Sequence, residues 1–358
     1  MSATKSLATA PKLGGNASNI KWALATLGMI LLFNLFFTPH FFEISLKNGH
    51  LFGSLIDVIY RSAPIIIMGI GMTLAIATKG IDISVGSVAA ISGAVAAELL
   101  TQANIPLYLV ILGAVGVSVL IGMWNGALIA VIGIQPIIAT LTMLVMGRGI
   151  AQLITDGQII GISNPGFEYI GNNGYVLGLP FAVTIAVVIF GLAVLLLRRT
   201  AMGMFIESIG INKSASRYAG INVRPIMFFI YVFTAFCASI AGLIYASNLK
   251  AADCNSAGLN TELDAILAVV IGGTSMDGGK FSLIGTVVGA LVIQALTTTI
   301  LTLGVPVQVT LIVRAMVVFL LCLLQSANFR RLLANAFKQA GTAMRTTKNT
   351  GKSEGSVA

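Results

Sequence analysis

The residues best placed to do chemistry in this sequence interrupt an apolar pattern between Met72 and Ser87. Lys79 and Gly80 end one apolar run, and Asp82, Ser84 and Ser87 follow before apolar sequence resumes. If lipid surrounds the chain, a broken helix and an ionisable group are tolerated only where protein or water covers them. The stretch therefore predicts part of a path for a polar solute. Asp82 has an alternative role as the cap of the helix that follows.

Other polar side chains within apolar runs extend this prediction. Arg148 and Gln152 are four residues apart and share one helical face, from which they could hydrogen-bond a hydroxylated solute. Alternatively, the Arg148 side chain reaches the membrane surface or pairs with an acid such as Asp156 or Asp264. The predicted path residues are Asp82, Ser84, Ser87, Asn125, Gln135, Thr140, Arg148 and Gln152.

The sequence offers no motif for catalysis, nucleotide binding or metal binding. Gly351-Lys352-Ser353 resembles the end of a phosphate-binding loop, but Thr346 stands where that loop needs its first glycine. The three cysteines, Cys237, Cys254 and Cys322, show no metal-binding or disulfide spacing. We therefore expect no catalytic residue, no metal and no cofactor bound by this chain. Uphill transport would draw its energy from another subunit or from an ion gradient.

Composition places the chain in lipid. Of its 358 residues, 57% are hydrophobic and 9% are charged, against about 25% charged residues in soluble domains. The net charge of +9 comes from lysines and arginines clustered at both ends and in one internal loop. Because no aromatic residues alternate with them, membrane flanks explain this charge better than nucleic-acid binding.

The fold class predicted is an all-α polytopic membrane protein with about ten transmembrane helices, some broken or re-entrant. Residues 21–328 form the transmembrane domain, residues 1–20 a disordered N-terminus and residues 329–358 a basic tail. The apolar runs are 22–37, 64–78, 81–100, 107–134, 136–154, 180–197, 226–246, 263–273, 281–303 and 307–324.

The distribution of lysine and arginine predicts the orientation. With both termini in the cytoplasm, only Lys47, Lys250 and Arg61 fall on the outer side, while most basic residues face inside. Within the membrane, the spacings Gly122-x-x-x-Gly126 and Gly285-x-x-x-Gly289 predict close helix packing. Segments 80–95 and 273–292 are weakly alike, each with glycines and polar residues before a small-residue helix. One interpretation is an internal duplication, and the alternative is two glycine-rich helix starts that arose independently.

The largest loop on the predicted inner side, residues 198–222, contains a short amphipathic segment from Ile211 to Tyr218. Its small residues suit docking into a groove on a partner, and the alternative is a solvated connector. The residues predicted to couple to a partner ATPase are Glu207, Gly210, Asn212, Ala215, Arg217, Ala219 and Gly220.

Five stretches together resemble the permeases of ATP-binding-cassette importers for sugars of the ribose, xylose and galactose type. They are Gly80–Ser87, Gln135–Leu141, Gly147–Gly149, Gly203–Val223 and Val270–Lys280, and the similarity extends over about residues 20–328. Within this family, Leu51–Asp57, Gly149–Thr155 and Leu263–Val270 are most similar to the galactofuranose importers.

This resemblance implies the permease fold and a bacterial inner-membrane complex. Such a complex has two permease chains, here a heterodimer, two cassette ATPase domains that bind ATP and Mg²⁺, and a periplasmic sugar-binding protein. Residues 211–220 would be the helix that contacts the ATPase. Two alternatives remain at this stage: a branched-chain amino acid permease of the same architecture, and an ion-coupled sugar carrier that works alone.

Overall fold

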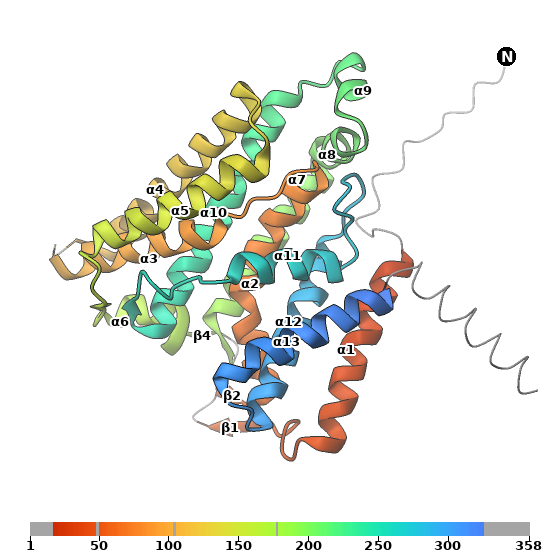
Figure 1. The fold of residues 1–358 in the computed structure, drawn as a ribbon. Coiled ribbons are helices and arrows are strands. Elements are labelled where there is room, and N and C mark those ends of the chain that lie inside the picture. Colours follow the sequence, from red (N-terminus) through yellow and green to blue (C-terminus); the bar gives the residue numbers. More distant parts are fainter. Residues whose placement is uncertain (1–16, 48–49, 103–104, 177, 326–358) are drawn as a thin grey trace, which may run out of the picture. The chain divides into compact units, whose positions relative to one another are not determined.

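The computed structural model describes residues 17–47, 50–102, 105–176 and 178–325, and most of these are helical (Figure 1). The longer helices are α1 (Ala17–Phe37), α2 (Ser54–Ala77), α3 (Val85–Gln102), α4 (Leu107–Ala127), α5 (Pro136–Ile154), α7 (Phe181–Arg199), α10 (Val223–Leu249), α12 (Leu283–Thr302) and α13 (Val307–Gln325). The shorter helices are α6 (Pro165–Glu168), α8 (Met202–Ile211), α9 (Lys213–Tyr218), α11 (Thr261–Ile271) and the π-helical turns η1 (Leu128–Ile132) and η2 (Tyr169–Asn173).

All ten predicted apolar runs are helices, which confirms the fold class. Within the described residues, seven helices are long and apolar enough to cross a membrane. Shorter apolar helices include α3 and α8, and α11 is shorter than a membrane span as well. The predicted start of the second run at Pro64 was wrong, because α2 begins at Ser54 and continues through this proline. The predicted tails beyond residues 17–325 lie outside the described residues, and the end of the predicted disordered segment 1–20 is already helical in α1.

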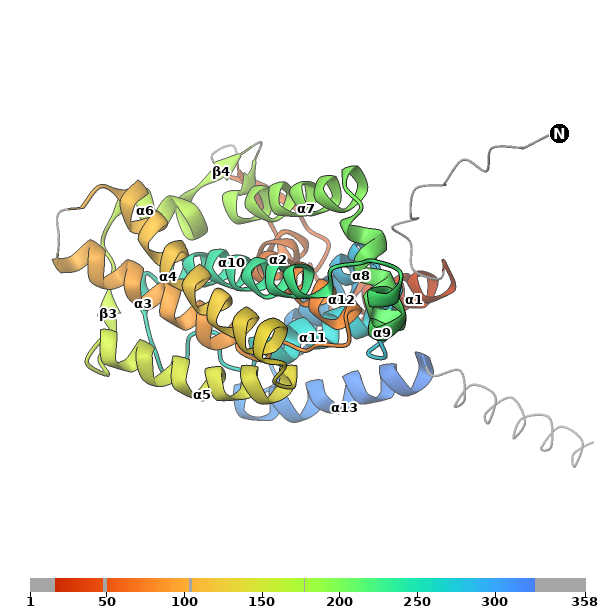
Figure 2. The same cartoon turned by 90° about the horizontal axis from the view of Figure 1, so that it is seen from above.

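Helices α2, α10 and α12 form the centre of the bundle. Helix α10 packs on α2, α3 and α4, while α12 packs on α1, α2 and α11. Figure 2 shows α10 and α2 between the surrounding helices α4, α5 and α7. Large apolar side chains on α5 and α7 are exposed, including Leu153, Val145 and Val187, and lipid is the solvent that suits such surfaces.

Glycines let the central helices approach one another closely. A Cβ on Gly122 would lie 2.6 Å from the Cβ of Ala235 in α10. A Cβ on Gly289 would lie 2.0 Å from the carbonyl oxygen of Ala268 in α11. The predicted small-residue packing is therefore confirmed at both spacings.

Short non-helical segments separate α2 from α3 and α11 from α12, and we call them the two breaks. They have related local structure. The first helix after each break begins beside a serine: the backbone carbonyl of Ser84 accepts from Val88 N–H at 2.9 Å, and that of Ser282 accepts from Thr286 N–H at 3.0 Å. Helix α11 also packs on α2 and α3. These are the two segments that sequence similarity paired.

Short strand pairs connect loops at the end of the bundle opposite to α8 and α9 (Figure 1). The pairs are β1 (Ser45–Lys47) with β2 (His50–Phe52), β3 (Ile160–Gly161) with β6 (Ala251–Ala252), and β4 (Tyr175–Val176) with β5 (Leu179–Pro180), all antiparallel. Residues from Gly304 onward form a separate unit, whose described part contains α13.

Candidate functional site

A buried polar joint lies at the break between α2 and α3. The Asp82 carboxylate accepts hydrogen bonds from the Ser84 N–H at 3.1 Å and the Ser84 hydroxyl at 2.5 Å. The Asn125 amide, from α4, donates to the same hydroxyl oxygen at 3.0 Å. All three side chains are at most 2% exposed. The structure thus brings three predicted path residues into one hydrogen-bonded group, with Asp82 holding the turn that leads into α3.

Two further path residues tie this joint to α5. The Ser87 hydroxyl donates to the carbonyl of Ser84 at 2.9 Å and to that of Met143 at 3.3 Å. The Thr140 hydroxyl donates to the carbonyl of Ile81 at 3.2 Å. Because these side chains are buried and bonded to protein, their first role in this chain is to join α3, α4 and α5. A role in lining a path stays a prediction.

The other three path residues lie apart from the joint. Gln135 precedes α5 and lines a cavity of about 460 Å³ that also touches Lys79 and Asn212. Arg148 donates to the carbonyls of Ala257 and Cys254, in the loop before α11.

Gln152, four residues after Arg148, donates to the Asn255 side chain at 2.7 Å. The predicted shared face of Arg148 and Gln152 is therefore real, and it contacts this loop.

Two polar residues near these sites were missed by the sequence analysis. Tyr231, in the first half of α10, is fully buried, and a Cβ on Gly80 would lie 2.3 Å from its hydroxyl. Glu262 is 7% exposed, and one of its carboxylate oxygens faces Gly86 at the start of α3. Among the described residues, neither this oxygen nor the Tyr231 hydroxyl has a hydrogen-bond partner. Hydropathy could not single out Tyr231, because one phenol does not interrupt an apolar run.

The predicted docking segment is two helices rather than one. Ile211 ends α8, and Asn212 begins α9 by accepting hydrogen bonds from Ser214 N–H and Ala215 N–H, both at 3.0 Å. The predicted helix start at Ile211 was therefore wrong. Helix α9 projects from the bundle in Figure 1, and Tyr218 is 94% exposed. The predicted contact residues Asn212, Ala215, Arg217, Ala219 and Gly220 are all exposed.

The other two predicted contact residues, Gly210 and Glu207, belong to α8 and are less exposed than those of α9. Gly210 is buried, and a Cβ there would lie 1.9 Å from the carbonyl oxygen of Ala77. Glu207 is half-buried, and burial raises the pKa of its carboxyl, while the nearby Lys280 ammonium lowers this pKa in part. The structure therefore places Gly210 against the permease itself and not on the exposed face that α9 presents.

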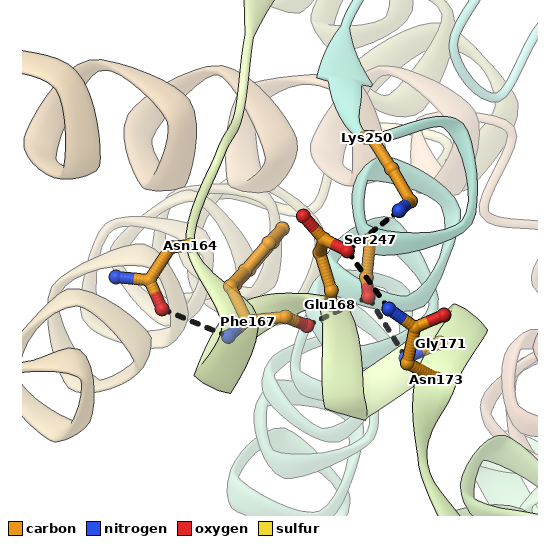
Figure 3. A network of polar contacts seen from close by, with 7 residues as sticks. All are labelled: Asn164, Phe167, Glu168, Gly171, Asn173, Ser247 and Lys250. Carbon is orange, nitrogen blue, oxygen red and sulfur yellow. Dashed lines mark hydrogen bonds and ion pairs between the residues drawn. The ribbon is translucent and has the colours of Figure 1, made fainter.

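A second polar group, which we call the α6–α10 network, anchors the segment between α5 and α7 at the opposite end (Figure 3). The Ser247 hydroxyl donates to the Phe167 carbonyl at 2.7 Å and accepts from the Gly171 N–H at 2.8 Å. Glu168 pairs with Lys250 at 2.6 Å and accepts from Asn173 at 2.9 Å. The side chains of this network come from α6, η2 and the end of α10.

Taken together, the membrane-length apolar helices and the polar segments that interrupt them define an all-α polytopic membrane protein. Comparison with known proteins identifies the family. The model of the family described as "Branched-chain amino acid transport system / permease component" matches residues 54–322, and the chain belongs to this family.

Curated relatives are similar over most of their length. The galactofuranose transporter permease protein of Escherichia coli is 49% identical over 87% of this chain and 90% of its own. The fructose import permease protein of Bifidobacterium longum is 42% identical over 89% of this chain and 91% of its own. The ribose import permease protein of Haemophilus influenzae is 37% identical over 78% of this chain and 84% of its own. No solved structure matches the chain.

Proposed function

We propose that this chain is the transmembrane permease subunit of an ATP-driven sugar importer. The observation that carries the proposal is the 49% identity to a galactofuranose permease over nearly the whole of both chains. Relatives named for fructose and ribose support a sugar over a branched-chain amino acid, although the family description mentions the latter. A galactofuranose or a related pentose or hexose is the proposed cargo.

The exposed helix α9 supports the proposal that a separate ATPase drives the cycle. Its surface presents Ala215, Arg217 and Ala219 on a short helix capped at Asn212, which suits a groove on a partner. ATP and Mg²⁺ bind that partner in this proposal. The remaining partners are a second, different permease chain, a periplasmic sugar-binding protein and membrane lipid, with both termini of this chain in the cytoplasm of a bacterial inner membrane.

The mechanism requires no covalent chemistry in this chain. The loaded binding protein delivers sugar on one side, and closure of the ATPase pair moves α9 on the other. The helices then expose the path alternately to the two sides. Because tight binding along the path would slow release, the permease needs few and weak sugar contacts, and selectivity belongs to the binding protein.

Reconstitution into liposomes tests the proposal. The permease pair, the ATPase and the binding protein should import labelled galactofuranose only when ATP is present on the side of the membrane that carries the ATPase. Leucine should not compete with galactofuranose for uptake. Uptake by this chain alone, driven by a sodium or proton gradient, would instead establish an ion-coupled carrier. ATP-driven uptake of leucine in place of sugar would establish the amino acid alternative.

A further inference from the structure

Three segments that are distant in sequence meet where α8 leads into α9, at residues 210–213, which we call the α8–α9 corner. We call this meeting point the α2–α8 junction. The three segments are Ala77–Lys79 at the end of α2, Gly210–Ile211 at the end of α8 and Gly278–Gly279 between α11 and α12. The Gly279 N–H donates to the Ala77 carbonyl at 2.8 Å. A Cβ on Gly210 would lie 1.9 Å from the Ala77 oxygen and 2.3 Å from the Gly279 nitrogen. Backbone therefore packs directly on backbone here.

Lys79 completes this junction with its side chain. Its ammonium donates to the carbonyl of Ile211, the last residue of α8, at 3.3 Å. Its stem lies over Gly278, where a Cβ would approach Lys79 Cγ to 2.5 Å. A cation at the last carbonyl of a helix is also favoured by the helix dipole. The side chain thus connects α2 to both other segments.

Lys79 holds a backbone conformation that lysine adopts at an energetic cost. Its φ is +63°, in the left-handed region that glycine occupies freely. The next residue is Gly80, yet the strained position carries the lysine. Backbone hydrogen bonds hold this conformation at the end of α2: the Lys79 N–H donates to the Ile76 carbonyl at 2.9 Å, and the Gly80 N–H donates to the Ala75 carbonyl at 3.0 Å.

The junction leads directly into both chain breaks. Thr78 to Ser84 connects α2 to α3 and contains the buried Asp82 joint, while Gly279 precedes Ser282, the cap of α12. On another side, the α8–α9 corner borders the cavity of about 460 Å³ lined by Ile211, Lys213 and Gln135. The corner thus contacts the residues that lead into both breaks, and it borders a cavity on another side.

We infer that Lys79 is a positioning residue that transmits movement of the α8–α9 corner to the starts of α3 and α12. This inference rests on the proposed function, in which an ATPase moves α9. It names the contact through which that movement reaches the membrane-embedded breaks. Lys79 touches neither sugar nor nucleotide in this account.

The substitution Lys79→Gly separates transmission from stability. Glycine relieves the strained backbone and removes the bond to Ile211, so the melting temperature of the purified chain should not fall. In the reconstituted importer, sugar imported per ATP hydrolysed should fall by about fivefold or more. Lys79→Arg keeps a cation that can reach the Ile211 carbonyl and should restore most of the ratio.

The matched control is Lys250→Gly. Lys250 is also a lysine with positive φ, +52°, and its side chain also makes a bond, to Glu168 at 2.6 Å. It lies at the far end of α10, away from the junction. Its ratio of uptake to hydrolysis should equal that of the wild type. Normal coupling in Lys79→Gly, or an equal loss in Lys250→Gly, overturns the inference.

Hydrogen exchange of the purified chain in nanodiscs gives a readout that needs no sugar. Lys79→Gly should increase exchange both at residues 278–282 and at residues 211–213, whereas a purely local effect would stay within 78–84. If the wild-type complex imports no sugar but these two segments respond together, the proposed function fails and the junction stands. If they do not respond, the junction is refuted whatever the complex transports.

Discussion

The α6–α10 network and the α2–α8 junction join helices at opposite ends of the bundle by different means. The network uses side chains: Ser247 bonds two backbone groups, and Glu168 pairs with Lys250 (Figure 3). The junction uses backbone contacts across glycines, with Lys79 as its one long side chain. Side-chain hydrogen bonds tolerate small shifts of the backbone. Two backbone segments in direct van der Waals contact leave no space between them, so a shift of one segment displaces the other.

This difference suits different tasks. A network of directional bonds holds a loop segment in a fixed place, as η2 and α6 are held on α10. A glycine-lined contact passes displacement on because its backbone segments touch directly, and the Lys79 side chain adds one further link between them. Substitutions at the network should therefore reduce stability alone, and substitutions of the junction glycines should affect both stability and coupling.

The largest effect is expected for Gly210→Ala. Its Cβ would lie within 1.9 Å of the Ala77 oxygen, so α8 and α2 must separate. We expect a loss of about 3 kcal/mol in the free energy of unfolding, the upper end for overpacking, together with lower coupling. Melting of the detergent-solubilised chain measures the first quantity. The control Gly191→Ala, whose Cβ would meet nothing within 4 Å, should be neutral or slightly stabilising; equal melting of both variants would contradict the contact.

Ser247→Ala should break the network without affecting coupling. The fully buried hydroxyl is lost, and the Phe167 carbonyl and the Gly171 N–H lose a partner. The expected loss is about 2 kcal/mol in the free energy of unfolding. Uptake per ATP should stay at the wild-type ratio in molecules that remain folded. Thr142→Ala serves as control, since that exposed hydroxyl bonds only its own helix at Ile138. A lowered ratio in Ser247→Ala would erase the contrast between the two regions.

Hydropathy predicted a helix at each of the ten apolar runs, because apolar segments in lipid must satisfy their own backbone hydrogen bonds. It missed the first turns of α2, where Asp57, Arg61 and Pro64 interrupt the apolar pattern although the helix continues. It also merged Ile211 with α9, although asparagine is a residue type favoured as a helix cap and Asn212 caps α9.

The partners within the site could not be predicted from the sequence. The sequence singled out Asp82, Ser84 and Asn125 as polar residues in apolar surroundings, but their mutual bonding depends on how α4 crosses the break before α3. Gly210 illustrates the same limit. Its position in a loop indicated a surface role, and only the packing of α8 on α2 buries it.

Asn212→Ala tests the segment that connects the junction to the exposed helix. The side chain caps α9 with two hydrogen bonds, and losing such a cap costs about 1 kcal/mol. Since α9 is short, part of its population should unfold, and affinity for the ATPase should fall by about fivefold. Pull-down titration of the ATPase measures this change. Asn212→Asp retains the acceptor and should bind as the wild type does; unchanged affinity in the alanine variant would mean that α9 is not the docking helix.

The smallest effect concerns Glu207, on the same helix as Gly210. Burial raises the pKa of this carboxyl in the folded chain, and Lys280 offsets only part of the shift. The folded state therefore binds the proton more tightly than the unfolded chain, so stability falls as pH rises through the window above the ordinary glutamate value.

Glu207→Gln removes this dependence. Its melting temperature should exceed that of the wild type at pH 7 and coincide with it below about pH 4, where glutamate is protonated in both states. Lys280→Gln should lower the melting temperature at pH 7, because the Glu207 carboxylate then loses its nearby cation. Parallel melting curves for wild type and Glu207→Gln across this range would show that α8 is solvated at Glu207. In that case the tight contact of α8 with the rest of the permease would begin only at Gly210.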